Sequence, residues 1–269
     1  MNWHILGSLF VREHGKVLRD EVFSPPMSDS ISPKYKRILL KLSGEALRAQ
    51  GSKDNISPEI VARIAREIAD AQKQGNLQIA IVVGGGNIWR GAKASVRGMD
   101  RPTADYVGML ATVMNALSIC SAVQEAGVPA HVMSAIEMKN VAEPYVRNTA
   151  RELLRDGQVV VFAAGTGNPF FSTDTAAALR ACEINAEVVM KATSVDGVYS
   201  ADPKVDPNAT RFDYISYEEC ISRELKVMDQ TAFTLCKDNR KPIMVFDMHQ
   251  PGNITRALLG EKIGSVISE

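Results

Sequence analysis

Short runs of apolar residues alternate with longer amphipathic segments along the chain from Tyr35 onward. Apolar runs of this length that end in glycine or polar residues predict buried strands. The predicted strands cover residues 37–42, 77–83, 159–163, 187–191, 212–215 and 243–247, with a further one around His131.

Amphipathic segments between these strands predict helices. The clearest is marked by isoleucines at every fourth position from Ile56 to Ile68; Ser57 and Pro58 open this helix and Gly75 ends it. The other predicted helices are 103–126, 147–156 and 175–184, with shorter ones near Glu218 and Phe233. Within 103–126, five apolar residues are interpreted as core packing: Met109, Leu110, Val113, Met114 and Leu117.

The repeated order of strand, glycine-bearing loop and helix predicts the fold class. It favours a single three-layer α/β/α domain, residues 34–269, built around a mostly parallel twisted sheet. Ligands of such sheets bind at the carboxyl ends of the strands. The chemistry is therefore expected in the loops that follow Leu42, Val83, Ala163 and Lys191.

The first 33 residues have a different composition. The apolar run 3–11 is too short to span a membrane and lacks the basic start of a signal peptide, and 24–33 is rich in Ser and Pro. Residues 1–33 are therefore expected to form a disordered extension and linker. Met27 stands just before the folded region, so Met1 and Met27 are both candidate start codons.

Charge and cysteine usage narrow the function classes. Lys plus Arg and Asp plus Glu number 31 each, so no overall field directs the chain to nucleic acid or to an anionic membrane. The four cysteines form no CxxC pair, and without an export signal they indicate reduced thiols and a cytoplasmic protein. No Ser/His/Asp set or metal-ligand spacing is present, so neither a hydrolase nor a metal site is expected.

Two of the loops carry groups that suit a phosphate. Lys41 lies at the end of the first strand beside Gly44, where its ammonium can meet an anion. Gly84–Gly86 lack Cβ atoms, so their backbone N–H groups can converge on an anion, and Arg90 follows within about one helical turn. Neither a Walker A loop nor a dinucleotide fingerprint fits this stretch. The alternatives are a solvated lysine and a tight turn without a ligand.

The other two loops add aromatic and hydroxyl groups. The loop 164–174 carries glycines, hydroxyls and an amide before a helix, and Phe170 and Phe171 can wall a base or a ribose. The loop 191–203 turns at Asp196 and Gly197 and presents Tyr199, whose ring can lie on an adenine. The alternative for Tyr199 is a simple turn with a half-buried tyrosine.

Two aspartates have both a structural and a functional interpretation. Asp174 can organise Mg²⁺ or hold lysines in place, or it can be an N-cap or first-turn residue. Asp105 lies in the first turn of the long helix, where the helix dipole alone accounts for it and a ligand role is the alternative.

Taken together, these stretches resemble the amino-acid kinase superfamily and, within it, the bacterial uridylate kinases. The resemblance covers Tyr35 to Glu269. It rests on residues 41–47, 84–91, 108–115, 133–136, 165–174, 191–199 and 224–229.

The resemblance implies roles for matching positions. Catalysis would involve Lys41, Arg90 and Asp174. The phosphates of ATP would contact Lys41, Leu42, Ser43, Gly44, Gly86 and Arg90, and its adenosine end Thr193, Tyr199 and Asp202. UMP would contact Gly85, Asp105, Thr166, Gly167, Asn168, Pro169, Phe170, Phe171, Ser172 and Thr173.

The implied activity is reversible transfer of the ATP γ-phosphate to UMP, giving UDP and ADP in the biosynthesis of UTP and CTP. Mg²⁺ would be carried by the nucleotide, and the family implies an allosteric homohexamer that UTP inhibits. The activator segment of that family is not matched by residues 48–57, so GTP activation is left open.

Two other functions compete with this one. The first is another superfamily member that makes an acyl or carbamoyl phosphate, and the second is a non-catalytic nucleotide sensor on the same fold. Phe170, Phe171 and Asp105 fit a nucleotide better than a small carboxylate. Intact Lys41, Arg90 and Asp174 argue against a sensor, because a sensor could lose them.

Overall fold

The computed structural model describes residues 33–49, 51–90, 98–201, 203, 205–225 and 227–269. The expected extension over residues 1–33 lies outside this part of the chain except for Pro33, as do both candidate start codons. Asp202, expected at the adenosine end of ATP, lies outside it as well.

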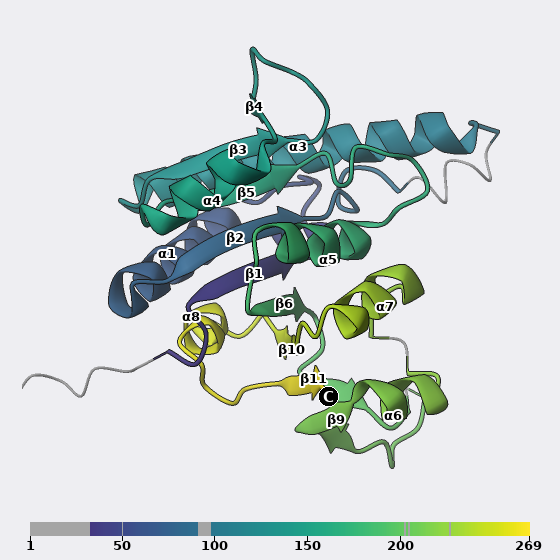
Figure 1. Cartoon of the computed structure of the whole chain (residues 1–269). Helices are drawn as coiled ribbons and strands as arrows, with labels where there is room; N and C mark the ends of the chain where they lie inside the picture. The colour runs from purple at the N-terminus through teal and green to yellow at the C-terminus, as the bar shows by residue number, and fades with distance from the viewer. Residues whose placement is uncertain (1–32, 50, 91–97, 202, 204, 226) are drawn as a thin grey trace, which may run out of the picture. The chain divides into compact units, whose positions relative to one another are not determined.

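One large sheet organises the described part of the chain (Figure 1). Its strand order is β4-β3-β5-β2-β1-β6-β10-β11-β9, and every bonded pair is parallel except β10 with β11. The expected mostly parallel sheet is thereby confirmed. Its strands are β1 (Arg37–Leu42), β2 (Gln78–Val83), β3 (Ala130–Ser134), β4 (Glu143–Pro144), β5 (Val159–Ala163), β6 (Val188–Thr193), β9 (Tyr214–Ser216), β10 (Ile243–Asp247) and β11 (Ser265–Ser268).

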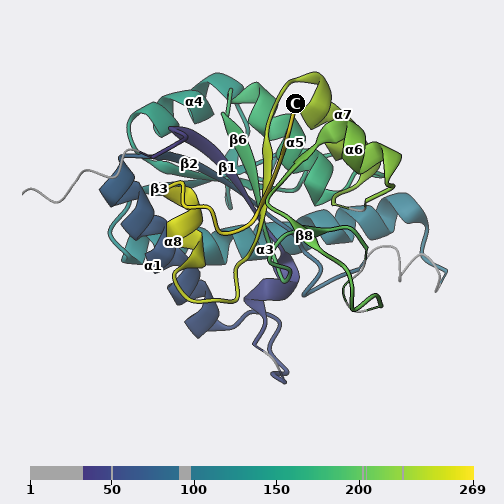
Figure 2. The same ribbon diagram turned by 90° about the horizontal axis from the view of Figure 1, so that it is seen from below.

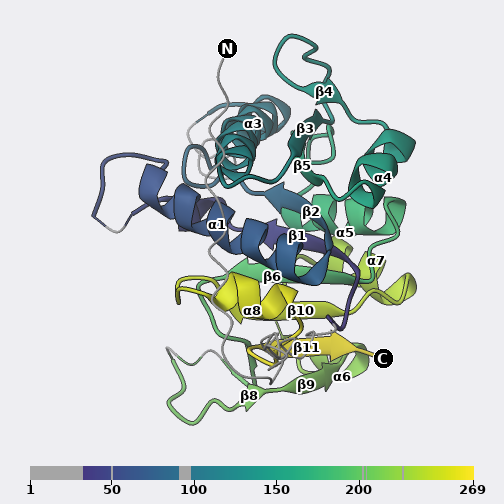
Figure 3. The same ribbon diagram turned by 90° about the vertical axis from the view of Figure 1, so that its left-hand side faces the viewer.

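Helices cover both faces of this sheet, as expected of parallel strands that are apolar throughout. One face packs against α1 (Pro58–Gly75), α3 (Arg101–Glu125) and α8 (Asn253–Leu258). The other face packs against α4 (Arg147–Arg155), α5 (Thr173–Glu183), α6 (Tyr217–Ser222) and α7 (Gln230–Asp238). Figures 2 and 3 show the two groups of helices on opposite sides of the strands.

Capping residues account for where the helices begin. Ser57 caps α1 and Pro58 is its first residue, as expected. Asp100 accepts a hydrogen bond from the backbone N–H of Thr103, and so α3 begins at Arg101, earlier than predicted. Ser172 accepts from two backbone N–H groups and starts α5 at Thr173.

The prediction of a single strand over 212–215 is wrong. Phe212 belongs to β8 (Arg211–Phe212), which pairs with β7 (Val198–Tyr199) in a separate two-stranded sheet. Tyr214 begins β9, which pairs with β11 in the large sheet. Asp213 therefore separates two strands with different partners, and a periodicity argument does not detect such a change.

The long helix α3 is only partly a core helix. Met109 and Val113 are buried as predicted, but Leu110 is 51% exposed, Met114 54% and Leu117 37%, so the assignment of these three residues to the core is wrong. By length and composition α3 could cross a membrane, yet half of its most apolar stretch is buried within the fold. A stripe of apolar residues on one side of this helix is therefore exposed to solvent.

The strands that matter for the site end at one edge of the sheet. Leu42 pairs with Val83, and Lys41 pairs with Lys191, so β1, β2 and β6 end at the same level. The loops after these strands and after β5 therefore meet at this edge, where parallel sheets bind their ligands.

Candidate active site

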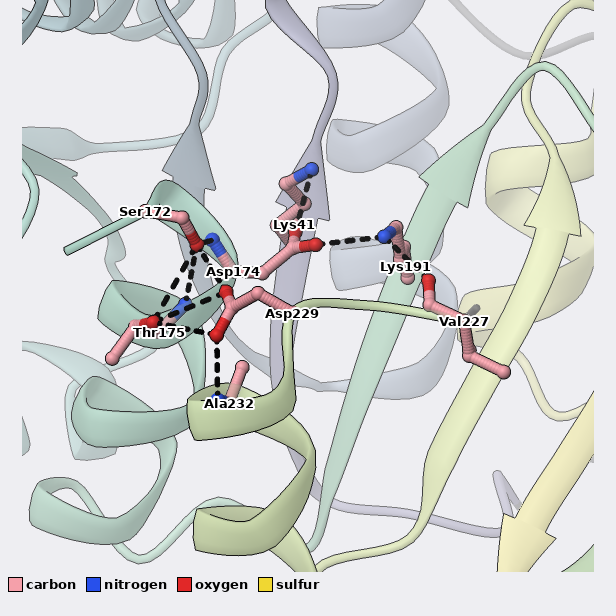
Figure 4. A network of polar contacts seen from close by, with 8 residues as sticks. All are labelled: Lys41, Ser172, Asp174, Thr175, Lys191, Val227, Asp229 and Ala232. Atoms are coloured by element: carbon pink, nitrogen blue, oxygen red, sulfur yellow. Dashed lines mark hydrogen bonds and ion pairs between the residues drawn. The ribbon is translucent and has the colours of Figure 1, made fainter. Parts of the chain in front are cut away.

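Two lysines on neighbouring strands share one carboxylate at this edge (Figure 4). Lys41 on β1 and Lys191 on β6 are register partners, with side chains 10% and 14% exposed. Asp174, in the first turn of α5, places Oδ1 2.8 Å from the Nζ of Lys41 and Oδ2 2.8 Å from the Nζ of Lys191. The carboxylate therefore bridges the two ammonium groups.

The electrostatics follow from this burial. Burial alone would raise the pKa of Asp174, but the charges of Lys41 and Lys191 outweigh it and hold that pKa below its usual range. Burial, together with the charge of Lys41, lowers the pKa of Lys191 in spite of Asp174. Asp174 is therefore ionised at neutral pH and holds the lysines, while the N-cap of α5 is Ser172.

Asp229 joins the N-termini of two helices beside this cluster. Its carboxylate accepts hydrogen bonds from the hydroxyls of Ser172 and Thr175 and, at 2.9 Å, from the backbone N–H of Ala232. Ser172 caps α5 and Asp229 caps α7. Both helices therefore direct their positive ends to the same region, which favours an anion there.

The glycine loop after β2 lies against the loop after β1. A Cβ atom on Gly44 would stand 2.3 Å from the carbonyl oxygen of Gly84, so only glycine permits this approach. Arg90 is half exposed and pairs with Glu45, with 2.6 Å between its Nη2 and Oε1. A Cβ on Gly86 would meet the same Oε1 at 3.1 Å. The groups that are expected to bind phosphate in these two loops therefore lie close together.

A cavity of about 140 Å³, lined in part by Ser172 and Thr173 next to Asp174 in the chain, gathers many of the residues expected to hold UMP. Its lining includes Gly85, Asp105, Thr166, Phe171, Ser172 and Thr173. Gly167, Asn168, Pro169 and Phe170 are not among its lining residues. The backbone N–H of Phe170 nevertheless donates to Oδ2 of Asp105 at 2.8 Å.

Asp105 is more than a helix-end residue. It also accepts from Nε of Arg101, 2.8 Å from its Oδ2, and Arg101 lies over the ring of Phe170. These contacts tie the first turn of α3 to the loop after β5. The Asp105 carboxylate therefore lines the cavity while Arg101 on α3 and Phe170 in the loop after β5 donate hydrogen bonds to it.

A second cavity of about 550 Å³ is lined by Lys191 of the cluster. Among its lining residues are Lys191, Thr193, Tyr199, Leu225 and Val227, so it contains two of the residues expected at the adenosine end of ATP. The hydroxyl of Tyr199 donates a hydrogen bond to Oδ1 of Asp196 at 2.8 Å. The larger cavity combines apolar lining residues with the ammonium group of Lys191.

Some expected contacts are limited by the fold. Leu42 is fully buried in the core, so only its backbone could contact a phosphate. Lys191, which belongs to the cluster, and Asp229, which lies beside it, were not among the predicted site residues. Both lie in stretches that carried the resemblance, 191–199 and 224–229, but only the strand register and the helix capping reveal their contacts.

Lys41, Asp174 and Lys191 thus form a charged cluster at the carboxyl edge of a parallel sheet, with Lys191 lining one cavity and Ser172 and Thr173, the neighbours of Asp174 in the chain, lining a second. The chain belongs to the amino acid kinase family, which matches residues 36–247. The expected family and its α/β/α fold are therefore confirmed.

Solved structures narrow the comparison within this family. The UMP kinase from Bacillus anthracis is 37% identical, with a TM-score of 0.83 over 87% of this chain and 96% of that one. The UMP kinase from Ureaplasma parvum is 36% identical, with a TM-score of 0.82 over 88% and 100%. The uridylate kinase from Archaeoglobus fulgidus is 33% identical, with a TM-score of 0.66 over 86% and 99%.

We expect Asp174→Asn to lower the free energy of unfolding by about 3 kcal/mol at neutral pH, because it leaves two buried ammonium groups without a counter-charge. The folded pKa of Asp174 is depressed, so its contribution is present above the pKa of an unfolded aspartate, about 3.9, and is lost as the pH falls further. Urea denaturation across this pH range measures both effects.

The matched control is Asp213→Asn, whose side chain is 88% exposed and pairs with Arg211. It should change stability little, because exposed ion pairs contribute little. Inorganic phosphate should restore part of the stability of Asp174→Asn. Equal stability of Asp174→Asn and the wild type at neutral pH would show that the carboxylate does not balance the lysines.

Proposed function

We propose that this enzyme is a uridylate kinase that reversibly transfers the γ-phosphoryl group of ATP to UMP, giving UDP and ADP. The observation that carries the proposal is the Lys41–Asp174–Lys191 cluster, with Lys191 lining one cavity and Ser172 and Thr173, next to Asp174 in the chain, lining another. The cluster can neutralise the phosphates of two bound nucleotides. The solved structures to which the chain is similar are UMP and uridylate kinases.

Transfer is direct and in line, without a phosphorylated enzyme. Among the residues that the structure describes, no histidine or cysteine lines either cavity, and phosphoryl transfer needs mainly positioning and charge neutralisation. Lys41 and Arg90 offset the charge of the phosphates, and Asp174 orients Lys41. Both oxygens of Asp174 face lysines, so this residue suits an ion-pair role better than Mg²⁺ ligation. Mg²⁺ arrives with the nucleotide.

ATP is assigned to the larger cavity, with its base and ribose near Thr193 and Tyr199. Its phosphates are assigned to residues 41–44, Gly86 and Arg90. UMP is assigned to the smaller cavity, with Gly85, Asp105 and residues 166–173 around it. Phe171, which lines this cavity, supplies the apolar wall that a base requires and a small carboxylate does not.

A coupled assay for ADP release tests this function with UMP, CMP, carbamate and acetylglutamate as acceptors. We expect turnover with UMP well above the other three. Preference for carbamate or acetylglutamate would establish an acyl or carbamoyl phosphate enzyme. ADP release with none of them, together with tight nucleotide binding, would favour the sensor.

The enzyme is assigned to the cytoplasm, to the biosynthesis of UTP and CTP, and to a homohexamer that UTP inhibits. An exposed apolar stripe on α3 supports self-association. It consists of Tyr106, Leu110, Met114 and Leu117, spaced so that they share one side of the helix.

A charge on this stripe should therefore reduce the size of the assembly. We expect Leu110→Glu to give smaller species by light scattering, because a carboxylate is costly in an apolar interface. Val205→Glu, at an apolar residue that is 80% exposed outside α3, is the control and should leave the mass unchanged. An unchanged mass for Leu110→Glu would remove the stripe from the interface.

Asp105→Asn should raise the KM for UMP about tenfold and leave the KM for ATP nearly unchanged, because the carboxylate is assigned to the ribose hydroxyls of UMP. Steady-state kinetics with each substrate varied in turn measure the difference. Arg101→Ala tests the alternative that Asp105 acts only by holding Arg101. Equal losses in the two variants would support that alternative.

Arg90→Ala should lower kcat about 100-fold, on the scale of one preorganised electrostatic contact, with smaller changes in both KM values. Arg90→Lys should recover only part of this loss, because an ammonium keeps the charge without the planar fork. Arg240→Ala, at an arginine that is 84% exposed, is the control. Near-normal turnover of a folded Arg90→Ala enzyme would exclude Arg90 from the transfer step.

A further inference from the structure

Arg180 on α5 is a buried cation that has no part in the transfer step. Its side chain is 5% exposed, and its Cζ lies 3.8 Å from the ring centroid of Tyr145 and 5.9 Å from that of Phe162 on β5. Removing a guanidinium from water is costly unless acceptors satisfy its N–H groups. The acceptors of Arg180 therefore indicate what this buried charge does.

Two acceptors share the planar fork of Arg180. Its Nη1 donates to Oε2 of Glu183 at 2.6 Å, one turn further along α5, and this contact balances the charge within the helix. Its Nη2 donates to the carbonyl oxygen of Gly165 at 3.4 Å. Gly165 lies in the loop after β5 and lines the smaller cavity. A single buried side chain therefore joins α5 to the loop that shapes this cavity.

The loop that receives this contact has an unusual backbone conformation. Ala164 has a φ of 61°, in the left-handed region that residues with a Cβ rarely adopt. Gly165 and Gly167 lie in the same region, with φ of 58° and 79°. Such a backbone persists only where contacts with the rest of the fold hold it. Thr112 on α3 holds the N–H of Ala164, and Arg180 on α5 holds the carbonyl of Gly165.

The contact with Gly165 also fixes the direction of the next N–H group in the chain. The C=O and the N–H of a trans peptide point in opposite directions. Because the carbonyl of Gly165 faces Arg180, the N–H of Thr166 points away from Arg180. Thr166 lines the smaller cavity, and within the described part of the chain its N–H donates to no backbone carbonyl. Arg180 therefore sets how this part of the loop is presented.

We propose that Arg180 is a positioning residue for the acceptor nucleotide, because it holds the carbonyl of Gly165 and so keeps residues 164–170 in the shape that binds UMP. The proposal rests on the proposed function. Arg180 is not among the described lining residues of either cavity, so it acts through the loop and not by touching a nucleotide. The competing explanation is that Arg180 only stabilises α5 through Glu183 and Tyr145. A purely stabilising residue leaves the KM for UMP unchanged in protein that remains folded.

Arg180→Lys is the first test, because an ammonium keeps a charge for Glu183 but lacks the fork that serves two acceptors. We expect the KM for UMP to rise about tenfold and the KM for ATP to change less than about twofold. Leu154→Ala, at a fully buried residue of α4 on the same face of the sheet, is the control. It should lower the melting temperature and leave both KM values unchanged.

A double variant takes the place of Arg180→Lys if that protein does not fold. Arg180→Met/Glu183→Gln removes both charges and so leaves no unpaired buried carboxylate. Its KM for UMP should rise about tenfold. Glu183→Gln alone leaves Arg180 on Gly165 and should keep the KM for UMP within about twofold of the wild type. A wild-type KM for UMP in the folded Arg180 variant, or an equal rise of both KM values, overturns the proposal.

Hydrogen exchange of the ligand-free proteins tests the same role without a substrate. The N–H groups of Ala164 and Gly167 are both hydrogen-bonded, and they should exchange at least about tenfold faster in the Arg180 variant than in the wild type or in Leu154→Ala. Unchanged exchange at both positions overturns the proposal. A wild-type enzyme that releases no ADP with UMP contradicts the uridylate kinase assignment instead, and the exchange rates then still decide whether Arg180 holds the loop.

Discussion

The site depends on keeping two like charges side by side at the edge of a buried sheet. Parallel pairing of β1 and β6 in this register makes Lys41 and Lys191 neighbours. Two mostly buried ammonium groups so placed repel each other, and each is costly to remove from water. Asp174 makes the arrangement tolerable because it offers one oxygen to each. The start of α5 must therefore be fixed accurately over both strands.

Polar contacts inside the fold provide that accuracy. Ser172 caps α5 and is itself held by Asp229, so the helix that carries Asp174 is tied to the start of α7. On the other face of the sheet, buried Asn115 donates to the carbonyl oxygen of Gly84 at 2.7 Å, and Thr112 accepts from the backbone N–H of Ala164 at 2.9 Å. The single helix α3 therefore fixes the loops after both β2 and β5.

The sequence was enough to predict the loops that carry the chemistry, because apolar runs ending in glycine locate the carboxyl ends of parallel strands. Lys41, Arg90 and Asp174 could be found in this way, since each stands in or beside such a loop. Lys191 could not, because its importance comes from its register with Lys41, and the two are 150 positions apart in the chain. The exposure of Leu110 on α3 depends likewise on which side of the helix meets the sheet.

Most side chains that line the two cavities lie outside the cluster, which divides substrate choice from transfer chemistry. Tyr199 and Thr193 shape one cavity, and Asp105 and Phe171 shape the other. None of these four side chains contacts Asp174 among the interactions of the described residues. A change in a cavity wall can therefore alter which nucleotide binds while the charges that stabilise transfer stay in place. The cluster itself has no such freedom, because Lys41 and Lys191 share the single carboxylate of Asp174.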